Sequence, residues 1–432
     1  MTRLLLTLLT VPKAWRIAPV ALALVLGACS SLPNANERRV PDVAAVADAS
    51  PERLALNAQV YDLVVNEVAE RHYQREEVAP HWREQAAEKR TEVIAGVDEA
   101  GFYTGLNAVL ADLGDKHTNA TRPRSNRLTR QRRLGEGLDF GFSLAGVGGG
   151  GGYVVDRVRA DGPAAEAGVK PGWRVDTVDG LPFSTTGSYI DGVHLWGFTD
   201  AGYHSQSASF AAAPLPRELG YVDRTAGGVA VITFNLFDAA TRQWVQARLA
   251  EFQADPPPGI IIDLRGNGGG DAAELRRILS PFFAVPTPYG IYDSGPIFGG
   301  IRKTGRWRTP WTGPLAVLIS GRTASAAELF AAAIQENHRG PVVGSKSAGA
   351  VVASRRFDLP DGGMLSVGVR AFRTASGATL EHVGVMPDIV TAPTMEDLRA
   401  NLDVTLDTAV KALLAPETAE AVAKPEPTPG PV

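Results

Sequence analysis

The second half of the chain alternates short apolar segments with amphipathic ones, and this alternation restricts the fold more than any other feature. From Gly228 onward, the strand-like segments are VAVITFNLF, GIIIDL, PLAVLIS and PVVGS, and between them lie the helix-like segments TRQWVQARLAEFQ, AAELRRILSPFF and SAAELFAAAIQEN. Short apolar runs separated by helices of this length are typical of βαβ units. The pattern predicts a parallel or mixed sheet covered by helices.

The rest of the chain has two other patterns. From Pro51 to about Leu113, apolar residues recur three and four positions apart, which predicts helices. From Leu138 to Gly180, the short runs LDFGF, YVVDRV and WRVDTVDG predict strands. We therefore expect an α+β multidomain protein. Its expected segments are a signal peptide at 1–28, a tether at 29–50, a helical domain at 51–120, a strand-rich domain at 134–224, an α/β core at 225–412 and a disordered tail at 413–432.

The charge balance argues against a nucleic-acid-binding protein. The chain of 432 residues carries a net charge of −4, so it lacks the overall basic character that binds phosphates. Its most basic stretch, RPRSNRLTRQRR at 122–133, is short and local. We interpret that stretch as a solvated connector between domains.

The N-terminus has the order of features found in an export signal. Basic residues precede the apolar run APVALALVLGA, and Cys29 follows that run. Leu26–Cys29 (LGAC) resembles the lipobox of bacterial lipoproteins, which implies that Cys29 is acylated and anchors the chain to a membrane. Ser30 implies, by the same resemblance, the periplasmic side of a Gram-negative outer membrane. An ordinary signal peptide with an incidental cysteine is the alternative, and a single cysteine predicts no intramolecular disulfide.

The strand-rich stretch resembles a PDZ domain. It has a GLGF-like turn at 137–142 (GLDFGF), and GPAAEAGVKPGWRVDTVDG follows at 162–180. The resemblance implies that a polypeptide C-terminus adds as a strand beside Phe140 to Leu144, with its carboxylate held by N–H groups of the turn. This prediction assigns peptide binding to Leu138, Asp139, Phe140, Gly141 and Phe142. A PDZ fold that serves only as a spacer or lid is the alternative.

Three motifs follow one another along the expected α/β core. Asp263–Gly270 reads DLRGNGGG at the end of an apolar strand, where open α/β sheets place their sites. GRTASAAELF follows at 321–330, and GVMPD at 384–388. Together with the PDZ-like stretch, these motifs resemble the C-terminal processing and tricorn-type serine peptidases. The resemblance implies a ClpP- or crotonase-like α/β core and peptidase activity.

Ser325 and Glu328 lie where a strand is expected to end and a helix to begin, and their spacing allows two interpretations. Ser followed three residues later by Glu is a capping box, which satisfies the free N–H groups of a helix start. The same position suits a nucleophile, because the unpaired N–H groups and the helix dipole stabilise negative charge there. The family resemblance assigns Ser325 as the nucleophile, and both roles are compatible.

The base that activates Ser325 distinguishes two branches of the family. In the C-terminal processing branch the base is a lysine, but the matching position here is Ala350, and Lys346 lies four residues too early. The tricorn-like branch uses a histidine before the PDZ domain, and LGDKHT at 113–118 resembles that motif. His117 is therefore predicted to be the general base, a task that suits a group titrating near neutral pH.

The resemblance also suggests the rest of the catalytic site. Glu381, just before the closing motif, is predicted to orient His117. Tricorn has a serine directly before its histidine, whereas this chain has Lys116, so the link from Glu381 could be direct, through Thr118 or water, or absent. The backbone N–H groups of Gly269 and Ala326 are predicted to form the oxyanion hole. Neither HExxH nor paired Cys-His spacing occurs, and no metal or cofactor is expected.

These features predict an exported, lipid-anchored serine endopeptidase that acts on polypeptides of the bacterial cell envelope, selected through their C-termini. The alternative is a catalytically silent relative that binds peptides or hydrophobic ligands on the same fold, as retinoid-binding members of the family do. The presence of both Ser325 and His117 favours the enzyme, since a binding protein needs neither. The sequence does not define an oligomeric state.

Overall fold

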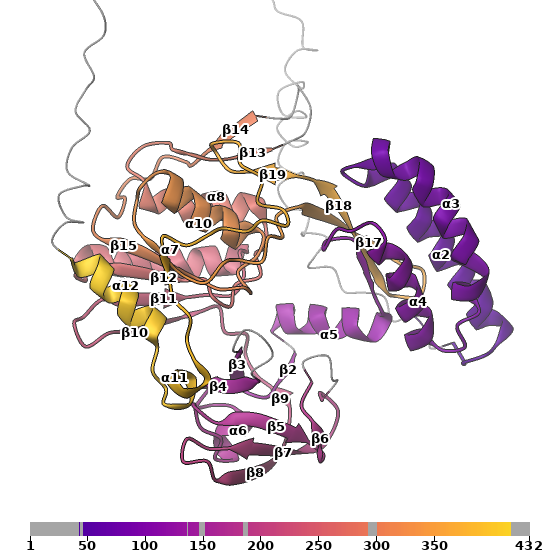
Figure 1. Ribbon diagram of the computed structural model, residues 1–432, viewed down its shortest axis with the longest axis horizontal. Coiled ribbons are helices and arrows are strands. Elements are labelled where there is room, and N and C mark those ends of the chain that lie inside the picture. Colours follow the sequence, from indigo (N-terminus) through magenta and orange to yellow (C-terminus); the bar gives the residue numbers. More distant parts are fainter. Residues whose placement is uncertain are drawn as a thin grey trace, which may run out of the picture. The chain divides into compact units, whose positions relative to one another are not determined.

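The computed structural model describes residues 43, 46–135, 137–146, 152–184, 189–292 and 300–415 (Figure 1). The described residues belong to one compact unit, Asp42–Val432. The expected signal peptide, Cys29, most of the tether and most of the C-terminal tail lie outside them. No described helix is both long enough and apolar enough to span a bilayer.

The expected α/β core has a six-stranded sheet in the order β10-β11-β12-β15-β16-β20. The strands from β11 to β20 are parallel, and β10 is antiparallel at the edge. Every residue of β11, β12 and β15 is buried, as expected for a sheet covered on both faces. Their bounds are β10 Tyr221–Arg224, β11 Ala230–Thr233, β12 Ile260–Asp263, β15 Leu315–Ile319, β16 Val342–Gly344 and β20 Ile389–Val390. The predicted βαβ alternation is confirmed.

Helices cover the two faces of this sheet unequally. Alternate residues of β15 point to opposite sides, so that Leu315, Val317 and Ile319 pack in the larger cluster with helices α7, α8 and α10. Ala316 and Leu318 pack in the smaller cluster with α12. The helices are α7 Ala239–Ala254, α8 Ala272–Leu279, α10 Ala326–Glu336, α11 Met395–Arg399 and α12 Val404–Leu414, and a 3-10 turn η3 spans Ser280–Phe282. A small sheet adds β13 Pro288–Tyr292, β14 Gly300–Lys303 and β19 Phe372–Arg373.

The expected N-terminal helices form, but they do not have a core of their own. They are α2 Pro51–Arg71, α3 Arg75–Ile94 and α4 Glu99–Ala111 (indigo to purple in Figure 1). Asp98 caps α4 by accepting the Gly101 N–H at 2.6 Å. The hydrophobic cluster of these helices also contains Ala120, Leu365 and Val367. The helices therefore pack on a sheet to which the distant C-terminal part of the chain contributes.

That sheet has three antiparallel strands, β1 Asn119–Thr121, β18 Met364–Arg370 and β17 Ala353–Asp358. β1 pairs with β18 from Asn119↔Ser366 to Thr121↔Met364. The segment that carries His117, between α4 and β1, is thereby attached to the C-terminal half of the chain. The Arg-rich stretch that we interpreted as a connector forms a helix, α5 Pro123–Leu134, whose buried Asn126 donates to the Gly362 carbonyl at 3.0 Å.

The strand-rich stretch forms a separate antiparallel sheet in the order β3-β4-β5-β7-β8, with β6 paired to β5. The Val-Asp-Gly turn joins β5 to β6 with positive φ at both Asp179 and Gly180, as a type I′ turn requires. An aromatic cluster around the buried Trp196 forms the core. The elements are β2 Leu138–Asp139, β3 Phe142–Gly146, β4 Tyr153–Val158, α6 Pro163–Glu166, β5 Arg174–Val178, β6 Leu181–Pro182, β7 Val193–Thr199, β8 Ser205–Ala211 and β9 Ala213–Pro214.

Candidate active site

Ser325 lies on a strained turn between β15 and α10. Its backbone has φ 56° and ψ −120°, a conformation that side-chain-bearing residues avoid. Such strain is usually kept only where the surrounding structure enforces it, and it clusters at functional sites. The Glu328 N–H donates to the Ser325 backbone carbonyl at 3.0 Å, and Ser325 and Glu328 have the arrangement of a capping box at the start of α10.

The carboxylate of Glu328 holds this turn in place. It is fully buried, and it accepts the Ser325 N–H at 2.9 Å. It also accepts the Ser347 hydroxyl at 2.6 Å and the N–H groups of Gly349 and Ala350, both at 2.8 Å. Glu328 therefore fixes the backbone of the turn that carries Ser325.

The two predicted oxyanion-hole donors, the N–H groups of Gly269 and Ala326, both lie beside Ser325. One of them already donates to another acceptor. A methyl group built on Gly269 would lie 2.6 Å from Ser325 Cβ and 3.0 Å from the Ala326 nitrogen, so only glycine fits. The Ala326 N–H is the first amide of α10 and has no acceptor within the helix. The Gly269 N–H, however, donates to Asn267 Oδ1 at 2.8 Å. Gly269 would have to share this N–H with an oxyanion.

Asp115 holds the backbone of the loop that carries His117. The Asp115 carboxylate accepts the N–H groups of His117 and Thr118 at 2.5 and 2.6 Å and the Thr118 hydroxyl at 2.6 Å. Burial raises the pKa of Asp115, but hydrogen bonds from His72, Thr118 and the two amides outweigh burial and lower that pKa to about 2. Asp115 is therefore a charged anchor for the loop that carries the predicted base.

A second histidine, which the sequence did not single out, supports Asp115. His72 is fully buried, and its Nε2 lies 2.7 Å from Asp115 Oδ2. Its Nδ1 accepts the Gln74 N–H at 3.3 Å, so Nε2 carries the proton and donates to the carboxylate. The only signal in the sequence was a histidine at the end of a predicted helix, which is too common a feature to identify a functional residue.

The structure brings Glu381 directly to His117. Glu381 Oε2 lies 3.7 Å from His117 Nε2, and both side chains are largely buried. Burial raises the pKa of Glu381, but His117 and the Val351 N–H, which donates to Oε2 at 2.6 Å, lower it more. Lys116 does not intervene, because its Nζ donates to the Ala348 carbonyl at 3.0 Å. The Thr118 hydroxyl is bonded to Asp115, so it does not relay between the two residues.

Four consecutive amides connect the two halves of the site. The N–H groups of Gly349 and Ala350 bind Glu328, and those of Val351 and Val352 bind Glu381 at 2.6 and 3.2 Å. The segment 349–352 thus ties the carboxylate that holds the Ser325 turn to the carboxylate that faces His117. Lys346, the lysine that we rejected as the base, has an exposed side chain.

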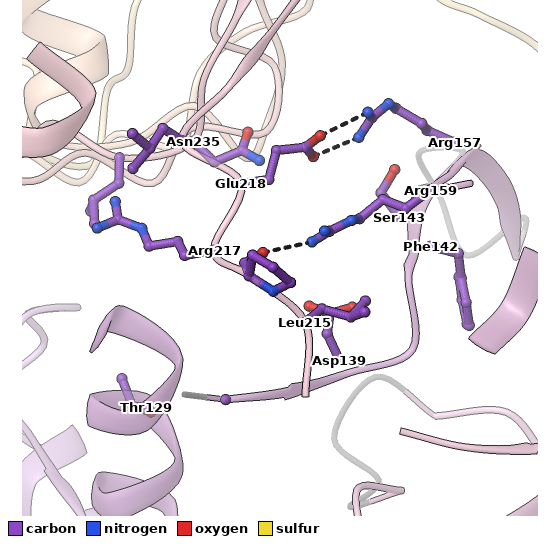
Figure 2. A pocket seen from close by; sticks show the side chains of 14 residues that line it. Thr129, Asp139, Phe142, Ser143, Arg157, Arg159, Leu215, Arg217, Glu218 and Asn235 are labelled. Carbon is purple, nitrogen blue, oxygen red and sulfur yellow. Dashed lines mark hydrogen bonds and ion pairs between the residues drawn. The ribbon is translucent and has the colours of Figure 1, made fainter. Parts of the chain in front are cut away.

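The turn predicted to bind a peptide carboxylate joins β2, which pairs with β9 in a two-stranded sheet, to β3 at the edge of the larger antiparallel sheet. Leu138 and Asp139 form β2, Phe140 and Gly141 the turn, and Phe142 begins β3. One cavity of about 350 Å³ adjoins this turn, and neither Ser325, His117 nor Glu381 lines it (Figure 2). Figure 2 shows Arg157, Arg159 and Arg217 at this cavity.

The chain is similar in sequence and in fold to known peptidases. Residues 228–391 match peptidase family S41. The chain is 27% identical over 330 residues to the chloroplast C-terminal processing peptidase of Tetradesmus obliquus, covering 68% of each chain. It is 26% identical over 309 residues to the carboxyl-terminal-processing protease of Synechocystis sp., covering 67% of this chain and 70% of that one.

The fold agrees with these relationships. The structure of the photosystem II D1 C-terminal processing protease superposes with a TM-score of 0.56 at 20% identity, covering 84% of this chain and 98% of that one. With a serine-peptidase family matched across the core that carries Ser325, the protein is a serine peptidase. Within that class, residues 228–391 match family S41, and the chain is similar to C-terminal processing peptidases.

Proposed function

We propose that the chain is an endopeptidase of the Ser-His type, in which Ser325 is the nucleophile, His117 the general base and Glu381 the residue that orients His117. The observation that supports this most is the segment 349–352, whose four amides bind the carboxylates beside Ser325 and His117. A protein that only binds peptides would need neither the strained serine nor a carboxylate aimed at the histidine.

The reaction proceeds through an acyl-enzyme. His117 removes the proton of the Ser325 hydroxyl as its oxygen attacks the scissile carbonyl, and a tetrahedral oxyanion forms. The Ala326 N–H donates to that oxyanion, with the Gly269 N–H as the second donor once it turns from Asn267. The imidazolium then gives its proton to the leaving amine, and the C–N bond breaks. Water, deprotonated by His117, hydrolyses the ester and restores Ser325.

Glu381 stabilises the imidazolium during both steps. Its oxygen faces His117 Nε2, so our proposal assigns the other ring nitrogen, Nδ1, to the Ser325 hydroxyl. The distance of 3.7 Å is longer than a hydrogen bond, and a charged imidazolium would draw the two groups together. Glu381 also keeps the imidazole ring of His117 in one orientation, because the N–H groups of Val351 and Val352 donate to the Glu381 carboxylate and hold it in place.

The test is labelling by a fluorophosphonate probe together with cleavage of an unfolded protein. We expect the chain without residues 1–29 to be labelled and to cleave, Ser325→Ala to lose both activities, and His117→Ala to lose about 100-fold or more. Ser207→Ala removes an exposed serine of β8 and serves as the matched control. Loss of activity in Lys346→Ala with retention in His117→Ala would refute our choice of base, and an unlabelled, inactive chain would favour the silent binding relative.

We also propose that the protein is exported and anchored by a lipid on Cys29, at the periplasmic face of a Gram-negative outer membrane. The support is the order of basic, apolar and small residues before Cys29. Its substrates would then be unfolded polypeptides of the cell envelope. Metabolic labelling with an alkyne fatty acid should mark the full chain and not Cys29→Ser. Equal labelling of both would refute the anchor.

A further inference from the structure

The turn and strand edge that resemble a peptide-binding site are already occupied by the chain itself. We propose that this peptidase does not recognise the free C-terminal carboxylate of its substrates, and that it accepts internal segments of unfolded polypeptides equally well. The proposal rests on the peptidase function and specifies its substrate class. It departs from the expectation that the family resemblance set for residues 138–142.

The first observation is a carboxylate of the chain at the turn. Asp139 Oδ1 accepts the Gly141 N–H at 2.8 Å. Gly141 has φ 77°, and a methyl group built on it would lie 2.7 Å from Gly162 Cα, so the turn is packed tightly against the next loop. An incoming carboxylate would have to displace Asp139 from this amide. It would also be repelled by the displaced negative charge at close range.

The second observation concerns the open edge of β3, beside which a substrate strand would add. β3 is the end strand of its sheet. Its Leu144 pairs with Val155, whose N–H and C=O both point toward residues 172–173, away from β3. In an antiparallel pair of this kind, the N–H and C=O groups of Leu144 point to the open edge.

Arg322 already binds this edge. Its Nη1 donates to the Leu144 carbonyl at 2.7 Å. A peptide pairing with β3 needs that carbonyl as an acceptor. Arg322 is three residues before Ser325, on the loop that leads to the strained turn. Strand addition would therefore remove a contact to the loop of the nucleophile.

The third observation is that the three arginines that line the cavity, Arg157, Arg159 and Arg217, each have a carboxylate partner. Arg157 makes a two-pronged contact with Glu218 at 2.6 and 2.8 Å (dashed in Figure 2). Arg159 donates to the Asp161 carboxylate at 2.8 and 3.0 Å and to the Pro216 carbonyl at 3.0 Å. Arg217 pairs with Asp238 at 2.5 Å. A terminal carboxylate would find none of these guanidinium groups unpaired.

The fourth observation is that the described residues near β3 include no long helix that could form the second wall of a groove. In the parts of 138–214 that the structure describes, the only helix is α6, which has four residues and precedes β5. The segment between β6 and β7 instead contributes Phe183 and Tyr189, whose rings stack 5.9 Å apart in the aromatic cluster.

The test uses one unstructured reporter peptide in two forms, ending in a free carboxylate or in a carboxamide. For the chain without residues 1–29, we expect the two kcat/KM values to agree within about twofold. A chain that read the carboxylate would prefer the free acid by about tenfold or more, since hydrogen bonds to a charged group contribute that much. Such a preference would overturn the proposal while the peptidase function stood.

Two substitutions test whether Asp139 and Arg322 block recognition of a free carboxylate. Asp139→Ala frees the Gly141 N–H, and combined with Arg322→Ala it should raise the preference for the free acid to fivefold or more. Asp255→Ala removes an exposed carboxylate at the end of α7 and should leave the ratio unchanged. An unchanged ratio in the double variant would also overturn the proposal. Fluorescence anisotropy of both labelled peptides with full-length Ser325→Ala gives the same comparison for a chain that cannot cleave.

Discussion

The carboxylate of Glu328 accepts the backbone N–H of Ser325 at 2.9 Å, and the two residues form a capping box at the start of α10. The motif thus caps the helix, and we propose that its serine is also the nucleophile. The acid terminates the helix and stabilises the turn, and the serine is held in a strained conformation next to Gly269.

Glu328→Gln should destabilise the protein and abolish labelling by the probe. All four partners of the carboxylate are donors, so the NH2 group of a glutamine would face an N–H or O–H group in a fully buried site. We expect a loss of about 2–4 kcal/mol in the free energy of unfolding, measured by urea denaturation. The control is Glu251→Gln, on the exposed face of α7. Wild-type labelling by Glu328→Gln would contradict the role of this carboxylate.

Gly269→Ala should inactivate the enzyme without unfolding it. The added methyl group would lie 2.6 Å from Ser325 Cβ, and φ at this position is 100°. We expect labelling to slow by about 100-fold or more, as when an oxyanion-hole donor is lost. Gly268→Ala is the matched control, because a methyl group there meets no atom within 4 Å. Equal labelling of the two variants would show that residue 269 does not border the reacting atoms.

His72 should act as a positioning residue for His117. His72→Phe removes the donor to Asp115, and we expect kcat to fall by about 10- to 100-fold because the base is displaced. His72→Gln can still donate and should restore part of the activity. His204→Phe replaces an exposed histidine side chain and is the control. If His72 only stabilised the fold, His72→Phe and His72→Gln would both be less stable than the wild type, but their kcat values would be the same.

Stability should fall in acid as Asp115 becomes protonated. Its pKa is about 2 in the folded chain against 3.8 as the ordinary value, so its charged form stabilises the fold above pH 4. That contribution is about 2 kcal/mol, and it disappears as the pH falls from about 4 to about 2. The free energy of unfolding of the wild type should therefore exceed that of Asp115→Asn clearly at pH 6 and only slightly near pH 2. A difference independent of pH would contradict this assignment.

Glu381 should add to the same loss. Its pKa lies below the ordinary 4.5 in the folded chain, so its contribution to the free energy of unfolding is also present at neutral pH and is lost as the pH falls through the folded pKa.

Glu381→Gln should lower kcat more than it lowers KM, because the imidazolium forms only during the reaction. Steady-state kinetics on an unfolded substrate would measure this, and an effect confined to KM would argue that Glu381 binds substrate instead.

The α/β core could be predicted because its signals are local. The buried strand Ile260–Asp263 is an apolar run followed by a glycine-rich turn, and Asp271 caps the helix that comes next, α8. The positions of Ser325 and Gly269 followed from the same local motifs. His117 and Glu381 were found through resemblance, and the structure brings them to within 3.7 Å.

Other features depend on contacts between distant parts of the chain. Nothing in the sequence near Asn119 indicates that this residue pairs with Ser366, so the helical domain was expected to be independent. The contact of Arg322 with Leu144 was hidden for the same reason. The hydrogen bond from the Gly141 N–H to the Asp139 carboxylate joins neighbours in sequence, but a GLGF-like turn predicts a ligand carboxylate at this amide and not a side chain of the same turn.

The pairing of β1 with β18 also has a temporal consequence. His117 is held between α4 and a strand whose partner spans Met364–Arg370, near the end of the core. A nascent chain that ends before this partner already contains the Ser325 turn but lacks the strand that holds the segment of His117. If His117 is the base, as we propose, the site is completed only when nearly the whole core has been synthesised.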